Sequence, residues 1–515
     1  MMFAAVSGVK HGRAGSSIFS RLEKAFIALG VCHTARLTAT KVCDSRESED
    51  LRHVQTGSMN RRHFLQQSLA ASAYVSAPAI LSAKSPNSMF QVASIGVGGM
   101  GGNTMMSVLQ HPKVRIVGMC DVDAKTLALA TKGMSSRRKE HQDPEAAKRL
   151  EDTAVFRDYR EMIANLGNTV DAITIGTPDH MHAAQAVSAL RAKKHVYLQK
   201  PLTHHIHEAR ILGAEAAKAG VTTQMGTQGH SSIETSLAVD LIKSGAIGKV
   251  KEVICWENKK ANWWPKVTER KAQADPVPEH IDWNLWLGVA NEVPFLEGAY
   301  HPSMWRSWVD FGVGMMGDMG CHYFDVVFAC LGLAAPTRVR CLDEGSKGDL
   351  YAQKRHLELE FPGTPLTAGD TIKMTWSDGG YPYDSRVIKP SVLTKDTPSG
   401  IFFIGENGGI FKPHSQRPWL VPEEKFTGHT YPKTRIANHY TDWVDACMKG
   451  AKASTDLPTY GCPVTEAVLL GVLAERNPGD WIEWDAAAGK VTNKPELNAQ
   501  LTRKYRDGWS VEGLG

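Results

Sequence analysis

Apolar positions after residue 89 follow two alternating patterns. Short continuous apolar runs are separated by longer stretches with helical spacing. Short buried runs are typical of strands in a parallel sheet, and the spaced stretches are typical of the helices that connect them. We therefore predict a doubly wound parallel sheet over residues 90–228. Its expected strands are Phe90–Gly96, Val114–Cys120, Val170–Ile175, His195–Leu198 and Val221–Gly226.

The pattern changes from about residue 229 onward. A helix is expected at Ile233–Lys243 and an alternating strand at Val250–Asn258, and both patterns recur later in the chain. We predict a second domain of α+β class over 229–515, with an open, largely antiparallel sheet that binds substrate and supports a homo-oligomer. Further expected strands are His356–Phe361, Thr371–Trp376 and Gly400–Phe411, and further helices are His439–Gly450 and Thr465–Glu475.

The first 83 residues fit neither pattern. Residues 1–58 have no periodicity, and Met59-Asn60-Arg61-Arg62 then precedes an apolar stretch from Phe64 to Ile80 with small residues up to Ala83. This order resembles a twin-arginine export signal over 59–83. We interpret 1–58 as a start-site overcall before Met59, or else as a disordered leader. The expected location is the periplasm, or the cytoplasm if the signal interpretation is wrong.

Charge, hydropathy and cysteine content give no indication of a nucleic-acid partner, a membrane span or a C-x-x-C metal or redox site. The 515 residues include 59 Lys and Arg against 54 Asp and Glu, a balance that gives no basis for a nucleic-acid partner. No apolar run reaches about 18 residues, so no membrane span is expected. The nine cysteines form no C-x-x-C pair, and Cys120 and Cys330 lie in apolar runs typical of buried positions.

A glycine-rich motif follows the first predicted strand. Gly96-Val97-Gly98-Gly99-Met100-Gly101 reads G-x-G-x-x-G and opens a helical stretch, and Asp121 ends the second strand. In a Rossmann unit the glycines allow a tight turn and a close approach to the pyrophosphate, while the acid binds the ribose hydroxyls. A carboxylate at this point repels a 2′-phosphate, so we expect NAD rather than NADP. The expected cofactor contacts here are Gly96, Gly98, Gly99, Met100, Gly101 and Asp121.

Two later strands also end in polar motifs. Gly176-Thr177-Pro178-Asp179-His180-Met181-His182 follows one strand, and Gln199-Lys200-Pro201 follows the next. Ligands of doubly wound sheets bind at the carboxyl ends of the strands, where these motifs fall. We therefore add Thr177, Pro178, His182, Gln199 and Lys200 to the expected cofactor site.

These motifs, taken in order, resemble those of the Gfo/Idh/MocA oxidoreductases. The likeness extends to Gly314-Met315-Met316-Gly317-Asp318-Met319-Gly320-Cys321-His322 with Asp325, and it covers the chain from about Phe90 onward. The resemblance implies a nicotinamide-dependent enzyme acting on a sugar or polyol, with Lys200, Asp318 and His322 as its catalytic set. One departure is Gln199, where the family has Glu, which removes a charge beside Lys200.

The same three residues suit the oxidation of a secondary alcohol. A base must take the hydroxyl proton, and histidine is suited to that task near neutral pH. Asp318 and His322 are four positions apart, so on a helix they share one face and the carboxylate can orient the ring. We assign His322 as base, Lys200 as electrostatic partner or proton relay, and Asp318 as orienting group, although these roles can be permuted.

Aromatic residues are dense between positions 256 and 308. Their faces either stack on sugar rings or form a core. We predict that Trp263, Trp264, His301 and Arg306 line the substrate pocket. No metal is expected, because His180, His204, His205 and His207 complete no ligand spacing.

Three functions remain open from the sequence. The first is an NAD-dependent dehydrogenase of a sugar or polyol. The second is an NAD-dependent glycoside hydrolase or lyase, which oxidises its substrate transiently and keeps tightly bound cofactor. The third is a non-catalytic sugar-binding protein, against which the intact Lys200, Asp318 and His322 argue.

Overall fold

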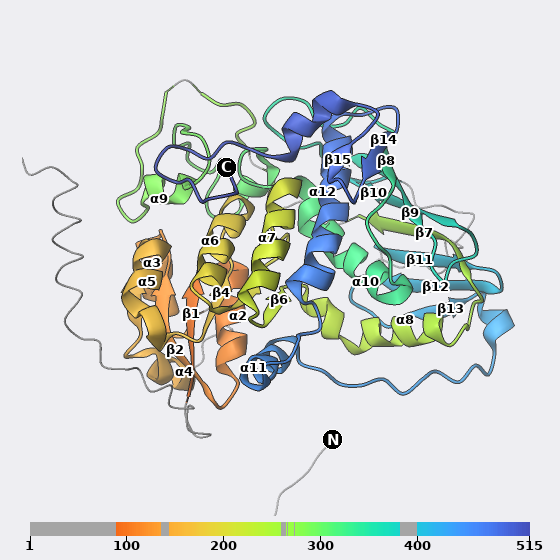
Figure 1. Ribbon diagram of the computed structural model, residues 1–515, viewed down its shortest axis with the longest axis horizontal. Helices are drawn as coiled ribbons and strands as arrows, with labels where there is room; N and C mark the ends of the chain where they lie inside the picture. The colour runs from red at the N-terminus through yellow and green to blue at the C-terminus, as the bar shows by residue number, and fades with distance from the viewer. Residues whose placement is uncertain (1–88, 135–143, 259–263, 265, 272, 382–398) are drawn as a thin grey trace, which may run out of the picture. The chain divides into compact units, whose positions relative to one another are not determined.

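The computed structural model describes residues 89–515, apart from 135–143, 259–263, 265, 272 and 382–398. The predicted leader, the twin-arginine segment at 59–83 and Trp263 lie outside the described residues. The expected fold class is confirmed, since a parallel α/β layer is followed by a larger, mostly antiparallel sheet (Figure 1).

The first sheet has six parallel strands in the order β3-β2-β1-β4-β5-β6. Strand order reverses between β1 and β4, which creates the crevice where doubly wound folds bind their ligands. Except for the edge strand β3, the strands are buried along most of their length, in accordance with the continuous apolar runs. They are β1 (Phe90–Ile95), β2 (Val114–Cys120), β3 (Ala154–Phe156), β4 (Ala172–Ile175), β5 (His195–Leu198) and β6 (Thr223–Met225).

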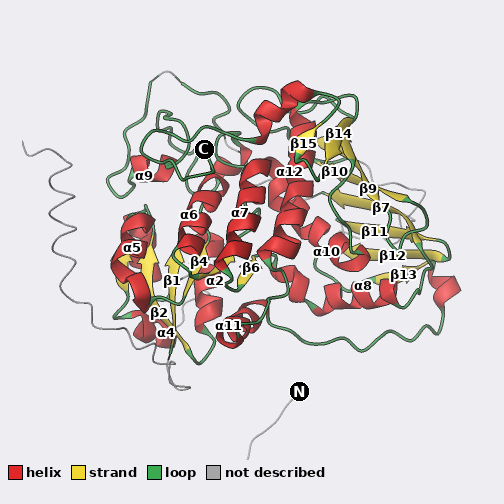
Figure 2. Ribbon diagram, viewed as in Figure 1, coloured by secondary structure: helices red, strands yellow, loops and turns green. Residues whose placement is uncertain are grey.

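Helices connect these strands and cover the sheet (Figure 2). Asp123 and Asp158 cap two of them, because each carboxylate accepts hydrogen bonds from amides of the following first turn. The connecting helices are α2 (Gly99–Leu109), α3 (Ala124–Ala130), α4 (Pro144–Leu150), α5 (Tyr159–Leu166), the short η2 (Gly167–Thr169), α6 (Asp179–Arg191) and α7 (Ile206–Ala219).

The second sheet has nine strands in the order β13-β12-β11-β7-β10-β9-β8-β14-β15. Its neighbouring strands are antiparallel except for β7 and β10, which run parallel. Its strands are β7 (Val250–Glu257), β8 (Arg338–Cys341), β9 (Arg355–Pro362), β10 (Thr371–Asp378), β11 (Gly400–Gly405), β12 (Gly408–Pro413), β13 (Trp419–Val421), β14 (Ile482–Asp485) and β15 (Lys490–Val491).

One expected strand is divided in the structure. The apolar segment 400–411 forms the hairpin β11–β12, in which Gly405 pairs with Gly408 across Glu406 and Asn407. Gly408 has a φ of +135°, a conformation that favours glycine and lets the chain reverse. The single-strand interpretation was wrong because a two-residue turn interrupts the apolar run.

The remaining helices belong to the second half of the chain. They are α8 (Ile233–Lys243), α9 (Trp283–Leu287), α10 (Cys321–Leu331), α11 (His439–Lys449) and α12 (Cys462–Arg476). The shorter turns are η3 (Gln228–Ser231), η4 (Met304–Ser307), η5 (Met316–Gly320), η6 (Glu423–Phe426), η7 (Leu457–Gly461) and η8 (Pro495–Leu501), of which η5 and η7 are π-helical.

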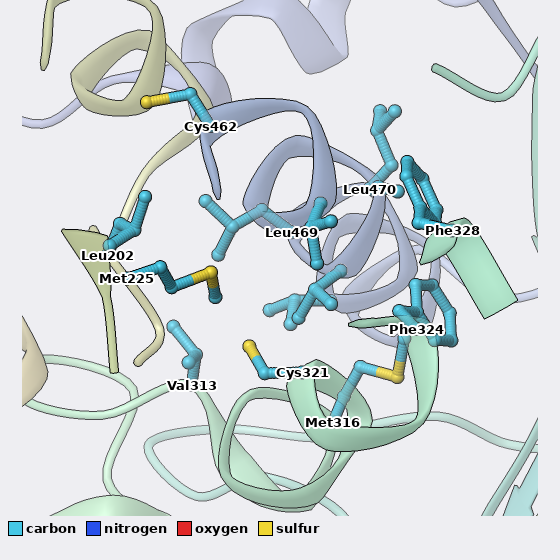
Figure 3. Packing of buried hydrophobic residues seen from close by; sticks show 14 of the residues in the cluster. Leu202, Met225, Val313, Met316, Cys321, Phe324, Phe328, Cys462, Leu469 and Leu470 are labelled. Atoms are coloured by element: carbon cyan, nitrogen blue, oxygen red, sulfur yellow. The ribbon is translucent and has the colours of Figure 1, made fainter. Parts of the chain in front are cut away.

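A single hydrophobic cluster joins the two sheet layers. Leu202 and Met225 of the first layer face Met316 and Cys321, and Leu469 of α12 lies beside them (Figure 3). The stretch Leu457–Arg476 is long and apolar enough to cross a membrane, but 78% of it is buried inside the protein. Core packing therefore fixes η5 and α10, which carry Asp318 and His322, against the first sheet.

The chain returns to the first layer after its second sheet. Trp443, Val444 and Cys447 of α11 pack in the cluster that holds β1, β2 and α2. All seven cysteines in the described part of the chain are buried and unpaired, Cys120 and Cys330 included. The first layer is thus completed by residues that lie more than 200 positions beyond its last strand.

Candidate active site

A cavity of about 400 Å³ opens at the carboxyl edge of the six-stranded sheet. Its walls come from the loops that follow β1, β2, β3, β4 and β5, and from residues 301–306. Asp318 and Trp509 complete the lining. The cavity therefore lies at the switch point of the strand order, where the sequence predicted a cofactor.

The glycine motif forms the turn between β1 and α2. Gly96 has a φ of +75°, and a Cβ there would lie 2.7 Å from the Gly176 carbonyl oxygen. A Cβ on Gly101 would overlap the Gly96 carbonyl oxygen, so both positions require glycine. Gly98 is the N-cap of α2 and has no side chain to bond the first amides. Those amides can accept a phosphate group, which fits a pyrophosphate at this helix end.

Asp121 is placed at the tip of β2 as predicted. Its Oδ2 accepts a hydrogen bond from the Val97 amide at 3.0 Å, and its Oδ1 accepts one from the Asp123 amide at 3.0 Å. Burial raises the pKa of this carboxyl group, although both amide hydrogen bonds oppose that rise. Asp121 thus ties the glycine turn to β2 and lines the cavity where a ribose would lie.

The motifs after β4 and β5 are held together by one histidine. His182 places its Nδ1 2.7 Å from the Pro201 carbonyl and its Nε2 2.9 Å from the Thr177 carbonyl. Burial lowers the pKa of His182 to about 4, so the ring is neutral at physiological pH and can donate a hydrogen bond to only one of these two carbonyls. The Thr177 hydroxyl donates to Gln185 at 2.7 Å. Thr177, Pro178 and His182 all line the cavity, as expected.

Gln199 also lines the cavity, and its amide contacts α2. Nε2 donates to the Thr104 hydroxyl at 2.9 Å, and the side chain is buried. A neutral amide can donate a hydrogen bond to that hydroxyl. A carboxylate at the same buried position would have no N–H group to donate. Gln199 therefore links β5 to the helix that begins at the glycine turn.

A charged cluster occupies the other end of the cavity. Lys200 Nζ donates to the Asp318 carboxylate at 3.0 Å and to the Asp318 carbonyl at 2.6 Å. Arg306 Nε donates to the same carboxylate oxygen at 3.2 Å. Burial raises the pKa of Asp318, but the charges of Lys200 and Arg306 outweigh it and hold the pKa well below its usual range. Asp318 is therefore an ionised anchor for two cations.

His322 lies one turn beyond Asp318, at the start of α10. A positive charge on His322 would lower the pKa of Asp318, so the two side chains are electrostatically coupled. The hydrogen-bond partners of the Asp318 carboxylate are nevertheless Lys200 and Arg306, and His322 is not among the cavity-lining residues. Its ring lies 5.6 Å from that of His414. Lys200 and Arg306 thus contact the Asp318 carboxylate, and the role of Asp318 in orienting His322 remains a prediction.

Asp325, the last acid of the same motif, lies outside the cavity. Its carboxylate contacts His230 Nδ1 at 2.9 Å and accepts a hydrogen bond from the Tyr460 hydroxyl at 2.9 Å. Burial lowers the pKa of His230, but Asp325 outweighs it and the net pKa is raised. Asp325 thus connects α10 to η3 and η7.

Asp179 is a cavity residue that sequence reasoning missed. It opens α6, is 5% exposed and lines the cavity. Burial raises its pKa to about 7, although the charges of Arg306 and Lys200 oppose the rise. The residue lay within the Gly176–His182 motif, but nothing in that motif indicated how deeply the carboxyl group is buried.

The four predicted substrate residues have different environments. Arg306 and His301 line the cavity, whereas Trp264 does not and packs against the large hydrophobic cluster. His301 Nε2 lies 3.1 Å from Asp123, at the cofactor end. Burial raises the pKa of Asp123, but hydrogen bonds from His301 and the Lys125 amide outweigh it and lower the pKa overall. The structure thus brings Arg306, and not Trp264, to the charged cluster.

The dense aromatic segment is mainly a core. Trp286, Tyr300, Trp305, Trp308 and Phe311 are buried in one cluster, and all of them except Trp305 pack edge to face or tilted against one another. Of these, Trp286 and Trp305 also form part of the cavity wall. Within the described part of this segment, the aromatic side chains available to a ligand in the cavity are therefore Trp286 and Trp305.

No group of three or more His, Cys, Asp or Glu side chains in the described ranges is arranged to hold a metal ion. His204 and His205 contact each other at 3.0 Å through their Nδ1 atoms. His207 instead points to the Gly513 carbonyl.

Curated relatives match part of the chain. An uncharacterised oxidoreductase, YrbE, from Bacillus subtilis is 25% identical over 189 residues, which cover 37% of this chain and 46% of YrbE. An inositol 2-dehydrogenase from Rubrobacter xylanophilus is 24% identical over 198 residues, covering 38% of this chain and 51% of the relative. The chain thus spans about half the length of these relatives.

Solved structures share the fold over most of the chain. A levoglucosan dehydrogenase in complex with NADH and levoglucosan has a TM-score of 0.51 at 15% identity, covering 76% of this chain and 99% of that one. GenD2 from gentamicin A biosynthesis, in complex with NAD, has a TM-score of 0.50 at 18% identity, covering 78% and 97%.

Two family models match the sequence directly. Residues 90–227 match the oxidoreductase family model described as an NAD-binding Rossmann fold. Residues 238–361 match the model for the C-terminal alpha/beta domain of the same family. Together these models cover about half of the chain, and the glycine turn, Asp121 and Lys200 lie inside the first. The chain belongs to the Gfo/Idh/MocA oxidoreductase family.

Proposed function

We propose that this protein is an NAD-dependent oxidoreductase that oxidises a secondary hydroxyl of a sugar or polyol. The observation that carries the proposal is one continuous cavity. It begins at the glycine turn and Asp121 and ends at Lys200, Asp318 and Arg306. A dinucleotide site and an acid–base cluster that share a cavity are what hydride transfer from an alcohol requires.

The residues of the first end fit NAD. The uncapped amides of α2 suit a pyrophosphate, and the partly buried carboxylate of Asp121 suits a ribose diol and disfavours a 2′-phosphate. NAD, when bound, would supply the hydride acceptor. Thr177, Pro178, His182 and Gln199 would line the remainder of its site.

The residues of the second end would handle the hydroxyl group. Lys200, held by Asp318, would contact the hydroxyl oxygen, stabilise its developing negative charge and relay its proton. His322, electrostatically coupled to Asp318, is the proposed final proton acceptor. Arg306 would fix a neighbouring oxygen of the substrate.

The names of relatives support a polyhydroxylated substrate. The inositol 2-dehydrogenase is named for a cyclic polyol, and the levoglucosan dehydrogenase structure contains an anhydro sugar. A cavity of about 400 Å³ with clustered charges and three tryptophans accommodates a ligand of this kind.

A second candidate function is a glycoside hydrolase or lyase that oxidises its substrate transiently. The observation that favours it is the pair Asp179 and Asp318, whose environments shift their pKa values in opposite directions. Elimination needs one group to take a carbon-bound proton and another to protonate the leaving oxygen. Asp179, protonated up to about pH 7, suits the second task. A non-catalytic binding protein would have no need for the Lys200–Asp318 ion pair.

Incubating the protein with NAD and a panel of sugars, polyols and glycosides, followed by mass spectrometry, tests these functions. A product two hydrogens lighter than its substrate, with matching NADH, is the expected result. A cleaved glycoside without net NADH would replace the dehydrogenase with the second function. If NAD binds but no compound of the panel changes, both enzymatic functions would be contradicted, and sugar binding without catalysis would be favoured.

Export through the twin-arginine segment at 59–83 is a further part of the proposal. The seven buried, unpaired cysteines of the described residues suit a protein that folds in a reducing compartment before transport. Changing Arg61 and Arg62 together to Lys should leave the protein in the cytoplasm, and unchanged location in cell fractions would refute export. A homo-oligomer, measurable by light scattering, remains a prediction.

A further inference from the structure

The segment 503–515 lies outside both regions that the family models match. It has no regular helix or strand, yet Tyr505, Trp509 and Leu514 are buried. Because three large side chains of this irregular segment are buried, the segment is packed against the rest of the protein along its length.

Hydrogen bonds fix this segment to the three helices on one side of the first sheet. Arg191 of α6 donates to the Glu512 carbonyl at 2.8 Å, and His207 of α7 lies 3.1 Å from the Gly513 carbonyl. The Tyr505 hydroxyl donates to the buried carboxylate of Glu208 at 2.7 Å. Arg160 of α5 reaches the Gly508 carbonyl at 3.4 Å.

The same segment is also fixed to residues 284–310, which precede Asp318. Arg506 donates to the Asn284 carbonyl at 2.9 Å and to the Gly288 carbonyl at 3.1 Å. Arg503 donates to the Asp310 carbonyl at 3.1 Å. The segment therefore bridges helices α5 to α7 and residues 284–310, and both groups include residues that line the cavity.

Trp509 is the residue of this segment that lines the cavity. The Arg160 guanidinium lies 4.1 Å from the centre of its ring, beside the first turn of α5. That turn follows β3, whose last residue, Phe156, accepts a hydrogen bond from the Asp121 amide. Trp509 thus lies on the side of the cavity where Asp121 and the end of β2 are found.

We propose that Trp509 is a cofactor-binding residue and that segment 503–515 is a strap that slows NAD release. The guanidinium groups of Arg160 and Arg506 lie 4.1 and 5.7 Å from the ring centre and position the indole, and the part of the ring that lines the cavity is an apolar aromatic surface that suits the adenosine half of a dinucleotide. The anchored backbone on both sides of Trp509 keeps the ring in place before the ligand arrives. This inference rests on the NAD-binding part of the proposed function and not on its substrate.

Calorimetric titration of the full chain with NAD tests the strap. The variant Trp509→Ala should raise the dissociation constant at least tenfold, and stopped-flow displacement should show a faster NAD release. Trp481→Ala is the matched control, because Trp481 also lies under arginines, Arg338 and Arg340 at 4.5 and 4.4 Å, but away from the cavity. The control should change NAD affinity less than twofold.

Fragments of the cofactor locate the contact. ADP-ribose should lose affinity for Trp509→Ala as NAD does, whereas nicotinamide mononucleotide should bind both proteins equally. Trp509→Phe, which keeps an aromatic ring, should recover most of the affinity. If Trp509→Ala does not fold, Trp509→Leu replaces it, since leucine retains apolar volume without an aromatic face.

The outcomes separate two failures. Unchanged NAD affinity and release in the alanine or leucine variant would overturn the strap while leaving the cofactor intact. Failure of the unaltered protein to bind NAD would overturn the proposed function, and the strap with it.

Discussion

The two ends of the cavity are built in different ways. At the dinucleotide end, the backbone forms the site: Gly96 and Gly101 allow a close turn, and Asp121 fixes it through the Val97 amide. At the charged end, side chains form the site, and Lys200 and Asp318 are 118 positions apart. The geometry of the first end depends on room for two backbone segments to approach each other. The geometry of the second end depends on the balance between partly buried charges.

This difference predicts how each end will fail. Adding one methyl group to a packed glycine of the turn should abolish cofactor binding at the dinucleotide end, because the tightly packed turn cannot shift to make room for it. The charged end should tolerate changes of shape and respond instead to loss of a charge or to pH. Four substitutions, from the largest expected effect to the smallest, test that distinction.

Gly101→Ala should abolish measurable NAD binding and lower the free energy of unfolding by about 3 kcal/mol, because the new Cβ would overlap the Gly96 carbonyl. Gly220→Ala, at the C-cap of α7 and outside the cavity lining, is the control, since nothing beyond its neighbouring residues lies within 4 Å of its Cβ position and the cost is backbone strain of about 1 kcal/mol. Urea unfolding and NAD titration measure both. Equal effects of the two variants would contradict the packing argument.

Lys200→Met should lower turnover about 10³-fold, because the charge that stabilises the developing oxyanion is lost. The fold should persist, since Arg306 still neutralises Asp318. Lys218→Met, on the exposed face of α7, should leave turnover unchanged. Steady-state kinetics with the identified substrate measure the turnover of both variants. Full turnover of Lys200→Met would refute the catalytic role of Lys200.

Asp179→Asn should change the dependence of stability on pH. Because the folded protein holds the Asp179 proton up to about pH 7 and the unfolded chain releases it earlier, the folded state binds more protons and loses stability as pH rises. Between pH 5 and 8 the unaltered protein should therefore lose roughly 2 kcal/mol more than the variant.

Urea unfolding at the two pH values measures this difference. Asp370→Asn, an exposed carboxylate between β9 and β10, should behave like the unaltered protein. Identical pH dependence in the Asp179 variant would mean that its carboxyl group is ionised in the fold.

His322→Asn should lower turnover about tenfold and leave NAD affinity unchanged, since the histidine acts beyond Lys200 and outside the cavity lining. The kinetics used for Lys200→Met provide the comparison. A loss as large as that of Lys200→Met would instead place His322 at the reacting hydroxyl, as the i, i+4 spacing first indicated.

Much of the fold could be predicted from the sequence. Strands β2 and β5 and helix α8 begin and end where the apolar pattern placed them. The hairpin β11–β12 was the main error, because an apolar run does not reveal a tight turn inside it. Patterns of this kind are short-range, and the backbone responds to them before any distant contact forms.

The sequence by itself determined the dinucleotide end of the cavity. Glycines at fixed spacing and an acid at a strand tip specify a backbone geometry that neighbouring residues can build alone. Gly96, Gly101 and Asp121 accordingly stand where the motif implied.

Only the tertiary structure determined which residues form the charged end of the cavity and the wall that contains Trp509. Helical spacing paired Asp318 with His322, but packing brought Lys200 and Arg306 to the same carboxylate, and permanent cations stabilise it more strongly. Packing also buried Asp179 and carried Trp509 to the cavity from the end of the given sequence. No local pattern encodes such contacts, because their energies depend on which distant side chains share a buried space.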